Sequence, residues 1–344
     1  MPRISVILCA YNASAFLKNA VESVLNQTQR DIELIIVNDG SLDSTLAVAS
    51  YYSHIDRRVK VVNIENGGLA NARNVGMSYA EGEFIAFCDA DDTVDPDALH
   101  TMLSAAEQKN ADLVICGYHH DTVLSDGKVS TVDVFEPEAY YNSKEELFLG
   151  IVGLKSKFIL DASWNKLFRR SCIADNGLKF PEGELFEDTA FVLSFLEHSC
   201  RVVVLPYCFY HYVQRKNGSI TKKYDPRKLN DLKKRYRELS EFTADADETV
   251  KKFCCLYYIK NVYSALANSY DDKKLTKQQR RELIMSETKD AQFKNCAAKS
   301  QGLGLSDKLT VLIAKLGFLP LDRVYCRAIH FMKTKASAVF AKIK

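Results

Sequence analysis

The sequence has little of what marks a secreted, fibrous or membrane-spanning protein. Seven prolines and fifteen glycines among 344 residues are too few for a collagen-like or low-complexity chain. No apolar run reaches the roughly 18 residues that a bilayer-spanning helix requires. The ten cysteines are dispersed and form no CxxC pair, so we expect reduced thiols in a cytosolic protein and not a disulfide scaffold.

The residues that are present indicate a soluble globular protein with an uneven distribution of charge. Hydrophobic residues make up 47% of the chain and charged residues 26%, which predicts a sizeable core. The formal net charge is +2, but residues 301–344 hold eight Lys and Arg against Asp307 and Asp322, so this segment carries +6 and residues 1–300 carry −4. This asymmetry predicts a basic tail that is directed at an anionic partner.

The first half of the chain alternates strand-like and helix-like segments. The opening letters MPRISVILCA also fit a signal peptide, but we interpret Ile4–Ala10 as a buried strand because a helical pattern follows it directly. Predicted strands are Ile4–Cys9, Ile32–Val37, Val59–Ile64, Glu83–Cys88 and Asp112–Cys116, and predicted helices are Ala15–Asn26, Ser44–Ser53, Leu69–Tyr79 and Asp97–Lys109. The alternation predicts an α/β, Rossmann-like fold with a mixed, mainly parallel sheet flanked by helices.

Ligands of such sheets lie beyond the carboxyl ends of the strands, and those ends are polar here. The letters are AYN at 10–12, NDGS at 38–41, ENGGLANARN at 65–74 and DADD at 89–92. NDGS also fits an ordinary turn. The paired glycines stand at a helix start, where free N–H groups favour an anion, although a simple glycine-assisted helix start explains them equally well.

The DADD segment carries the strongest chemical signal. Asp89 and Asp91 share one side of an extended chain, and Mg²⁺ or Mn²⁺ is typically bound by one or two carboxylates together with substrate phosphates. Helix capping accounts for one aspartate but not for three. An EF-hand is excluded because its sixth and twelfth positions are Val94 and His100. DADDT also fits the D-x-D-x-T motif of haloacid-dehalogenase-like phosphatases, in which Asp89 would be the nucleophile.

Four segments together resemble the motifs of family 2 glycosyltransferases, which have the GT-A fold: SVILCAYN, IELIIVNDGSLDST, NGGLANARNVGMSYAEGEFIAFCDADD and FEDTAF. The resemblance covers residues 1–220. It implies an inverting enzyme that moves a sugar from a nucleotide-sugar to a hydroxyl of a glycan or lipid-linked glycan. The expected donor is a UDP-sugar. In this family the nucleotide is bound by residues that correspond to Ala10, Tyr11, Asn12, Asp39, Arg73 and Asp89.

The resemblance also implies roles for the acidic residues. Asp89 and Asp91 would bind Mn²⁺ or Mg²⁺ on the diphosphate, and Asp188 in FEDT would be the catalytic base. A carboxylate is a suitable base because the metal stabilises the leaving group. For Glu187 and Asp188 taken alone, favourable charge at a helix start explains the pair better. A non-catalytic subunit that binds a sugar nucleotide is a further alternative.

Further candidates stand on the acceptor side and in the loop that closes on the diphosphate. The single tryptophan in SWNKLF is either a platform for a sugar ring or a core residue. The segment HYVQRKNGSIT resembles the family's closing loop. The candidates in these segments are Trp164, Glu187, His211, Gln214, Arg215 and Ser219.

The chain divides by pattern into three parts. Residues 1–220 form the catalytic domain, with a donor half at 1–110 and an acceptor half at 111–220; residues 221–300 are helical, and 301–344 form a basic amphipathic tail. Such a tail either lies on an anionic membrane surface or packs on the rest of the protein. We expect a cytoplasmic protein that is peripheral at the inner face of the cell membrane and acts in bacterial surface polysaccharide synthesis. No nucleic-acid motif occurs, and the oligomeric state and the donated sugar stay open.

Overall fold

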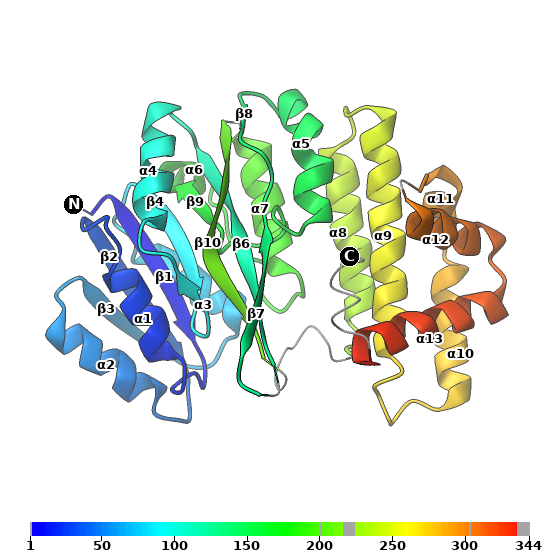
Figure 1. Ribbon diagram of the computed structural model, residues 1–344, viewed down its shortest axis with the longest axis horizontal. Coiled ribbons are helices and arrows are strands. Elements are labelled where there is room, and N and C mark those ends of the chain that lie inside the picture. Colours follow the sequence, from blue (N-terminus) through cyan, green and yellow to red (C-terminus); the bar gives the residue numbers. More distant parts are fainter. Residues whose placement is uncertain (1, 125, 200, 216–223, 303, 336–344) are drawn as a thin grey trace. The chain divides into compact units, whose positions relative to one another are not determined.

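The computed structural model describes residues 2–124, 126–199, 201–215, 224–302 and 304–335. The chain forms two compact units, Met1–Asn217 and Gly218–Lys344 (Figure 1). Each is described separately below.

The first unit is built on one ten-stranded sheet with the order β3-β2-β1-β4-β9-β6-β10-β5. Four strands pair in parallel at one side: β1 (Ile4–Ala10), β2 (Ile32–Asp39), β3 (Val59–Ile64) and β4 (Phe84–Asp89). A second parallel pair is formed by β6 (Leu113–Val123) and β10 (Val202–Gln214). These long parallel pairings confirm the predicted α/β class.

Short antiparallel strands connect and extend the two parallel groups. The strand β9 (Lys166–Arg169) lies between β4 and β6 and joins the groups into one sheet. The remaining short strands are β5 (Thr93–Val94), which pairs with β10, β7 (Val129–Val134), which pairs with β6, and β8 (Ala139–Tyr141), which pairs with β10. The antiparallel β9 was absent from the sequence prediction.

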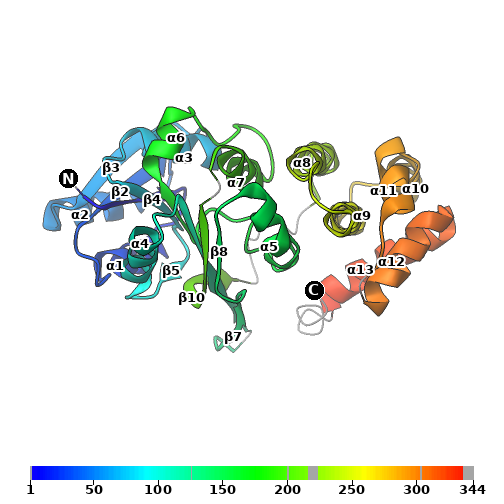
Figure 2. The same cartoon turned by 90° about the horizontal axis from the view of Figure 1, so that it is seen from above.

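Helices cover both faces of this sheet, as the view in Figure 2 shows. One face carries α1 (Leu17–Leu25) and α4 (Ala98–Gln108), and the other carries α3 (Leu69–Ser78) and α7 (Glu187–His198). Every residue of β1 and β2 is buried, as expected for parallel strands that are covered on both sides. The first unit also contains α2 (Thr45–Ile55), α5 (Lys144–Ser156) and α6 (Arg170–Asp175).

The second unit is helical and is organised around α9 (Glu248–Asn268). This 21-residue helix is buried on most of its circumference and contacts five other helices. A helix that is apolar on all sides belongs at the centre of a bundle. Around it lie α8 (Lys228–Phe242), α10 (Lys277–Thr288), α11 (Ala291–Lys299), α12 (Leu305–Leu316) and α13 (Leu319–Lys335).

Residues of the predicted tail belong to this bundle. Both α12 and α13 contact α9, and Lys333 Nζ donates to the Ser264 carbonyl (2.8 Å) and to Asn268 Oδ1 (2.8 Å). Within the described residues, we find no helix with the length and apolar character that crossing a membrane would require.

Candidate active site

The loops after β1 and β2 are joined by hydrogen bonds at the carboxyl edge of the sheet. The Asn12 N–H donates to Ser41 Oγ (3.0 Å), and the Leu42 N–H donates to Asn12 Oδ1 (2.8 Å). Asn12 has a φ of 48°, which asparagine tolerates better than most residues. Ala10 is buried in β1, whereas the Tyr11 side chain is about half exposed, at 51%. The loop is therefore fixed, with the Tyr11 ring accessible at the edge.

Asp39, at the end of β2, binds the loop that leads into α3. Its carboxylate accepts from the N–H groups of Gly67 (2.7 Å) and Gly68 (3.0 Å), and from Asn66 Nδ2 (3.3 Å). The residue is buried, and it occupies the anion-binding N–H groups at the helix start. The anion that the paired glycines bind is thus the chain's own Asp39.

Arg73 in α3 brings three carboxylates together, and we call these four residues the carboxylate cluster. Its Nη2 lies 3.1 Å from Asp89 Oδ1, and its Nη1 lies 3.1 Å from Glu187 Oε1 and 2.9 Å from Asp188 Oδ1. The arginine is only 1% exposed, and its guanidinium also lies over the ring of Phe180 at 5.2 Å. The structure therefore joins the ends of two separate motifs, FCDADD and FEDT, around one buried cation.

The backbone before α7 aims the last two acids at Arg73. Phe186 precedes the helix with a φ of 61°, a left-handed conformation that costs a residue with a side chain about 1–2 kcal/mol. Glu187 and Asp188 are the first residues of α7, where the helix dipole also favours negative charge. Strained backbone beside charged groups is common at functional sites.

The carboxylate cluster is short of positive charge. One guanidinium faces three carboxylates, and Asp91 stands two residues beyond Asp89. Burial raises the pKa of Asp89 despite the nearby Arg73, and burial together with the charge of Asp188 raises the pKa of Glu187. A divalent cation would offset the excess charge, and carboxylate oxygens are the ligands that Mg²⁺ and Mn²⁺ prefer. The residues present therefore fit such an ion at Asp89 and Asp91.

Asp91 is the exposed member of the DADD segment. Its side chain is 53% exposed, and Arg215 Nη1 lies 3.3 Å from its Oδ2. Arg215 Nη2 also donates to the Asp91 carbonyl (2.9 Å), and the guanidinium lies 4.2 Å from the centre of the Phe16 ring. Arg215 follows β10 directly, so the structure brings the predicted closing segment to the predicted metal ligand. Gln214 is the last residue of β10.

Asp92 has a structural role, which the sequence did not predict. It is buried, and it accepts from Tyr210 Oη (2.9 Å) and from the Val213 N–H (2.8 Å). Tyr210 Oη in turn accepts from the Asp89 N–H (3.0 Å). Burial raises the pKa of Asp92 well above its ordinary value, and the charge of Asp89 adds to this. Asp92 and Tyr210 thus attach β10 to the end of β4. In the sequence, the only indication of this role of Asp92 was that it is a third aspartate beside the predicted metal ligands Asp89 and Asp91.

The aromatic and histidine candidates have different surroundings. Trp164 stacks on Tyr210 with 4.3 Å between ring centres and on Tyr212 with 5.6 Å. It therefore belongs to an aromatic cluster of the acceptor half. His211 points away from these tyrosines, because side chains alternate along β10, and its Nδ1 lies 2.7 Å from Asp121 Oδ2. The last candidate, Ser219, lies outside the described residues.

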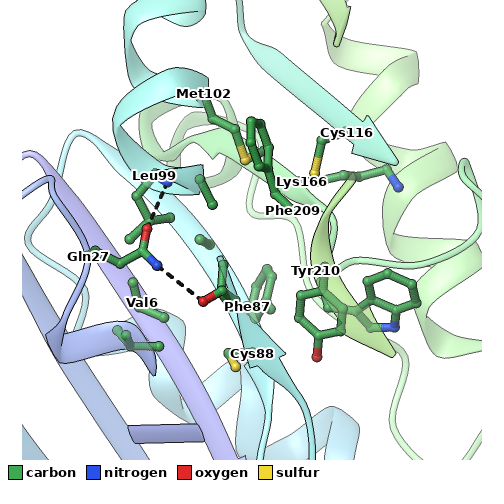
Figure 3. Close-up of a pocket in the computed structure, with 15 residues that line it drawn as sticks. Val6, Gln27, Phe87, Cys88, Leu99, Met102, Cys116, Lys166, Phe209 and Tyr210 are labelled. Carbon is green, nitrogen blue, oxygen red and sulfur yellow. Dashed lines mark hydrogen bonds between the residues drawn. The ribbon is translucent and has the colours of Figure 1, made fainter. Parts of the chain in front are cut away.

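A small cavity lies beside this region, inside the core (Figure 3). Gln27 spans one side of it, where its Oε1 accepts from the Leu99 N–H (3.0 Å) and its Nε2 donates to the Val94 carbonyl (3.5 Å). Its lining is mainly apolar and, within the described chain, includes no member of the carboxylate cluster. We therefore assign the cavity to core packing and not to ligand binding.

The chain matches one family model and two relatives from Bacillus subtilis. Residues 5–175 match the model of the family "Glycosyl transferase family 2". EpsH of Bacillus subtilis, which is named as a glycosyltransferase, is 40% identical over 219 residues, which are 61% of this chain and 60% of EpsH. EpsJ of the same species, an uncharacterized glycosyltransferase, is 32% identical over 69% of this chain and 68% of EpsJ. The chain thus spans three fifths of EpsH and about two thirds of EpsJ.

The solved structure of residues 1–349 of S. aureus TarS with UDP-GlcNAc has the same fold. Its TM-score is 0.68 at 20% identity, over 98% of this chain and 92% of the TarS chain. This likeness confirms the GT-A fold and the helical C-terminal region. DADDT is then part of a glycosyltransferase motif set and not of a phosphatase. The order of the motifs, the acidic residues that meet at Arg73 and these matches agree with one another. The chain belongs to glycosyltransferase family 2.

Proposed function

We propose that the protein is a metal-dependent, inverting glycosyltransferase that uses a nucleotide-sugar donor. The observation that carries the proposal is the carboxylate cluster: Arg73 joins Asp89 to Asp188, with Asp91 exposed beside them. A nucleotide diphosphate is anionic, so an acidic site can bind it only with a cation between them. When bound, Mn²⁺ or Mg²⁺ at Asp89 and Asp91 would stabilise the negative charge of the leaving diphosphate.

In this proposal, Asp188 removes the proton from the acceptor hydroxyl as that oxygen attacks the anomeric carbon. Arg73 fixes the position of the Asp188 carboxylate at 2.9 Å. Ala10, Tyr11, Asn12 and Asp39 form the nucleotide side, where Tyr11 offers an exposed ring. A UDP-sugar is the first donor to test, because TarS, with the same fold, was solved with UDP-GlcNAc.

The acceptor that we propose is a glycan or a lipid-linked glycan of bacterial surface polysaccharide synthesis, at the inner face of the cell membrane. An exposed apolar face on α12 supports membrane contact. Leu305, Leu309, Leu312 and Leu316 recur at helical spacing and are each at least 50% exposed. The exposed Lys308 and Lys315 lie along one edge of this face. An apolar face bordered by lysines fits an anionic lipid surface.

A substitution of the base tests the proposed chemistry. Asp188→Asn keeps the shape of the side chain but cannot accept the proton, so we expect sugar transfer to fall about 10²–10⁴-fold while UDP binding persists. The measurement is UDP release from a panel of UDP-sugars in the presence of membrane lipid extract. The neighbouring Glu187→Gln serves as the matched variant, with a smaller expected loss. Full transfer by Asp188→Asn would contradict the assignment of Asp188 as the base, and absence of transfer by the wild type with every UDP-sugar would favour a non-catalytic, nucleotide-binding role.

A further inference from the structure

Two histidines form a separate cluster on the face of β10 opposite to Tyr210 and Tyr212. His119 in β6 and His211 in β10 are register partners, and their rings stack with 4.4 Å between centres. Asp95, just after β5, faces both rings: its Oδ2 lies 3.5 Å from His119 Nε2 and its Oδ1 lies 3.1 Å from His211 Nε2. The strands β6 and β10 and the residue after β5 therefore bring two imidazoles and a carboxylate together.

The other nitrogen of each ring is held by a further carboxylate. His119 Nδ1 lies 2.7 Å from Asp133 Oδ1, and His211 Nδ1 lies 2.7 Å from Asp121 Oδ2. Asp121 is buried and itself accepts from Thr131 Oγ1 (2.5 Å). A carboxylate that accepts from Nδ1–H fixes the ring with Nε2 directed at Asp95, and a metal ion would take the place of the proton between Nε2 and that carboxylate. Metal-ligating histidines are oriented in this way.

We infer that Asp95, His119 and His211 bind a transition-metal ion of the Zn²⁺ class, at a site distinct from Asp89 and Asp91. Ligand atoms at about 2.0–2.1 Å from a tetrahedral ion are about 3.3 Å apart. The two nitrogen–oxygen separations, 3.1 and 3.5 Å, lie on either side of that value, and all three ligand atoms lie within 4.8 Å of one another. Imidazole nitrogen selects Zn²⁺ or a similar ion over Mg²⁺ and Ca²⁺.

Charge and access agree with an ion at this place. Three carboxylates, those of Asp95, Asp121 and Asp133, surround two imidazoles, so a divalent cation would offset excess negative charge. The ligand side chains are 19–37% exposed, which allows an ion to enter from solvent and leaves a fourth position for water.

The ion would join segments that border the donor site. The strand β5 follows Asp91 closely, and β10 ends immediately before Arg215. A metal held by Asp95, His119 and His211 would therefore fix β5 and β10 next to the Asp91–Arg215 ion pair. The inference concerns metal binding alone and does not depend on the proposed transfer reaction.

Co²⁺ is a suitable probe, because its visible absorption reports both binding and coordination geometry. We titrate the full chain, free of affinity-tag histidines, with Co²⁺ in the absence of nucleotide. We expect one equivalent to bind with a spectrum of four-coordinate Co²⁺ that Zn²⁺ displaces. Asp91→Asn should leave this titration unchanged, and His119→Gln and His211→Gln should abolish the spectrum. Asp121→Asn should weaken binding by about 10- to 100-fold.

His198→Gln, at an exposed position in α7, is the matched control and should behave as the wild type. Circular dichroism establishes that each variant is folded. Absence of four-coordinate Co²⁺ in the wild type would overturn the inference, whatever the variants do. It would equally be overturned if the folded His119→Gln protein kept the wild-type spectrum, or if Asp91→Asn removed it. Should the histidine variants fail to fold, the Asp121→Asn titration decides: unaltered affinity contradicts the site.

Discussion

Arg73 and Lys166 are two buried cations of the first unit with opposite surroundings. Arg73 faces three carboxylates, whereas Lys166 Nζ donates to the carbonyls of Ile159 (2.6 Å) and Ala162 (2.5 Å) and to Asn165 Oδ1 (2.8 Å). Arg73 was expected at the sheet edge from its motif, but its burial was not, because a motif does not reveal which distant segment packs over it. Lys166 and Asn165 are structural, and they fix the loop before β9.

The lysine makes stability depend on pH. Burial lowers the pKa of Lys166 to about 7, while its pKa in an unfolded chain is about 10.4. Between these values the unfolded chain holds a proton that the folded chain lacks, so this group makes the free energy of unfolding rise with pH. We expect a rise of up to about 1.4 kcal/mol per pH unit from pH 7 to 9.

Urea unfolding at pH 7, 8 and 9 measures this rise. Lys166→Met should remove the rise relative to the wild type, and Lys179→Met, at an exposed position, should keep it. Parallel pH profiles for the wild type and Lys166→Met would show that Lys166 is protonated in the folded protein throughout.

At the scale of elements, β10 connects the acceptor half to the acidic strand end. It is one long strand, Val202–Gln214, with irregular pairing to β6 between Val204 and Tyr210. The bounds of the predicted strands and helices up to α4 lie within about two residues of the observed ones, because their periodicity is local. The last predicted strand, Asp112–Cys116, is too short, because β6 continues to Val123. The short β9 could not be predicted, since its pairing with β4 and β6 depends on tertiary contacts.

The adjacent residues Asp91 and Asp92 should contribute very differently to stability. Asp92 is buried and bonded to Tyr210 and Val213, so Asp92→Ala leaves buried donors unsatisfied, and we expect a loss of about 2–3 kcal/mol of unfolding free energy. Asp91 is half exposed, and we expect Asp91→Ala to stay within about 0.5 kcal/mol of the wild type. Urea unfolding at neutral pH compares the two. Equal losses would mean that Asp92 does not hold β10 in place.

At the level of the whole molecule, the described part of the predicted basic tail forms two packed helices, α12 and α13. One face of α12 and α13 contacts α9, while leucines of α12 stay exposed. Amphipathic spacing predicted the helices correctly, but it could not tell which apolar residues pack within the protein. Packing and membrane contact are therefore compatible in this part of the chain.

Vesicle binding tests the exposed face. The double variant Leu312→Glu, Leu316→Glu adds negative charge at positions that are 55% and 57% exposed, so the fold should persist. We expect its partition onto vesicles rich in phosphatidylserine to fall at least tenfold in a sedimentation assay. Leu149→Glu, at an 82% exposed position of α5, is the control. If the double variant sediments as the wild type does, α12 is not the membrane contact.

Calorimetry of UDP binding with and without Mn²⁺ tests the metal-dependent nucleotide site directly. In the proposed site, Asp89 and Asp91 would hold the ion that binds the diphosphate. UDP should therefore bind the wild type tightly only when Mn²⁺ is present, and Asp91→Asn should lose this dependence together with most of the affinity. UDP affinity that is indifferent both to Mn²⁺ and to Asp91→Asn would contradict the proposed metal-dependent nucleotide site.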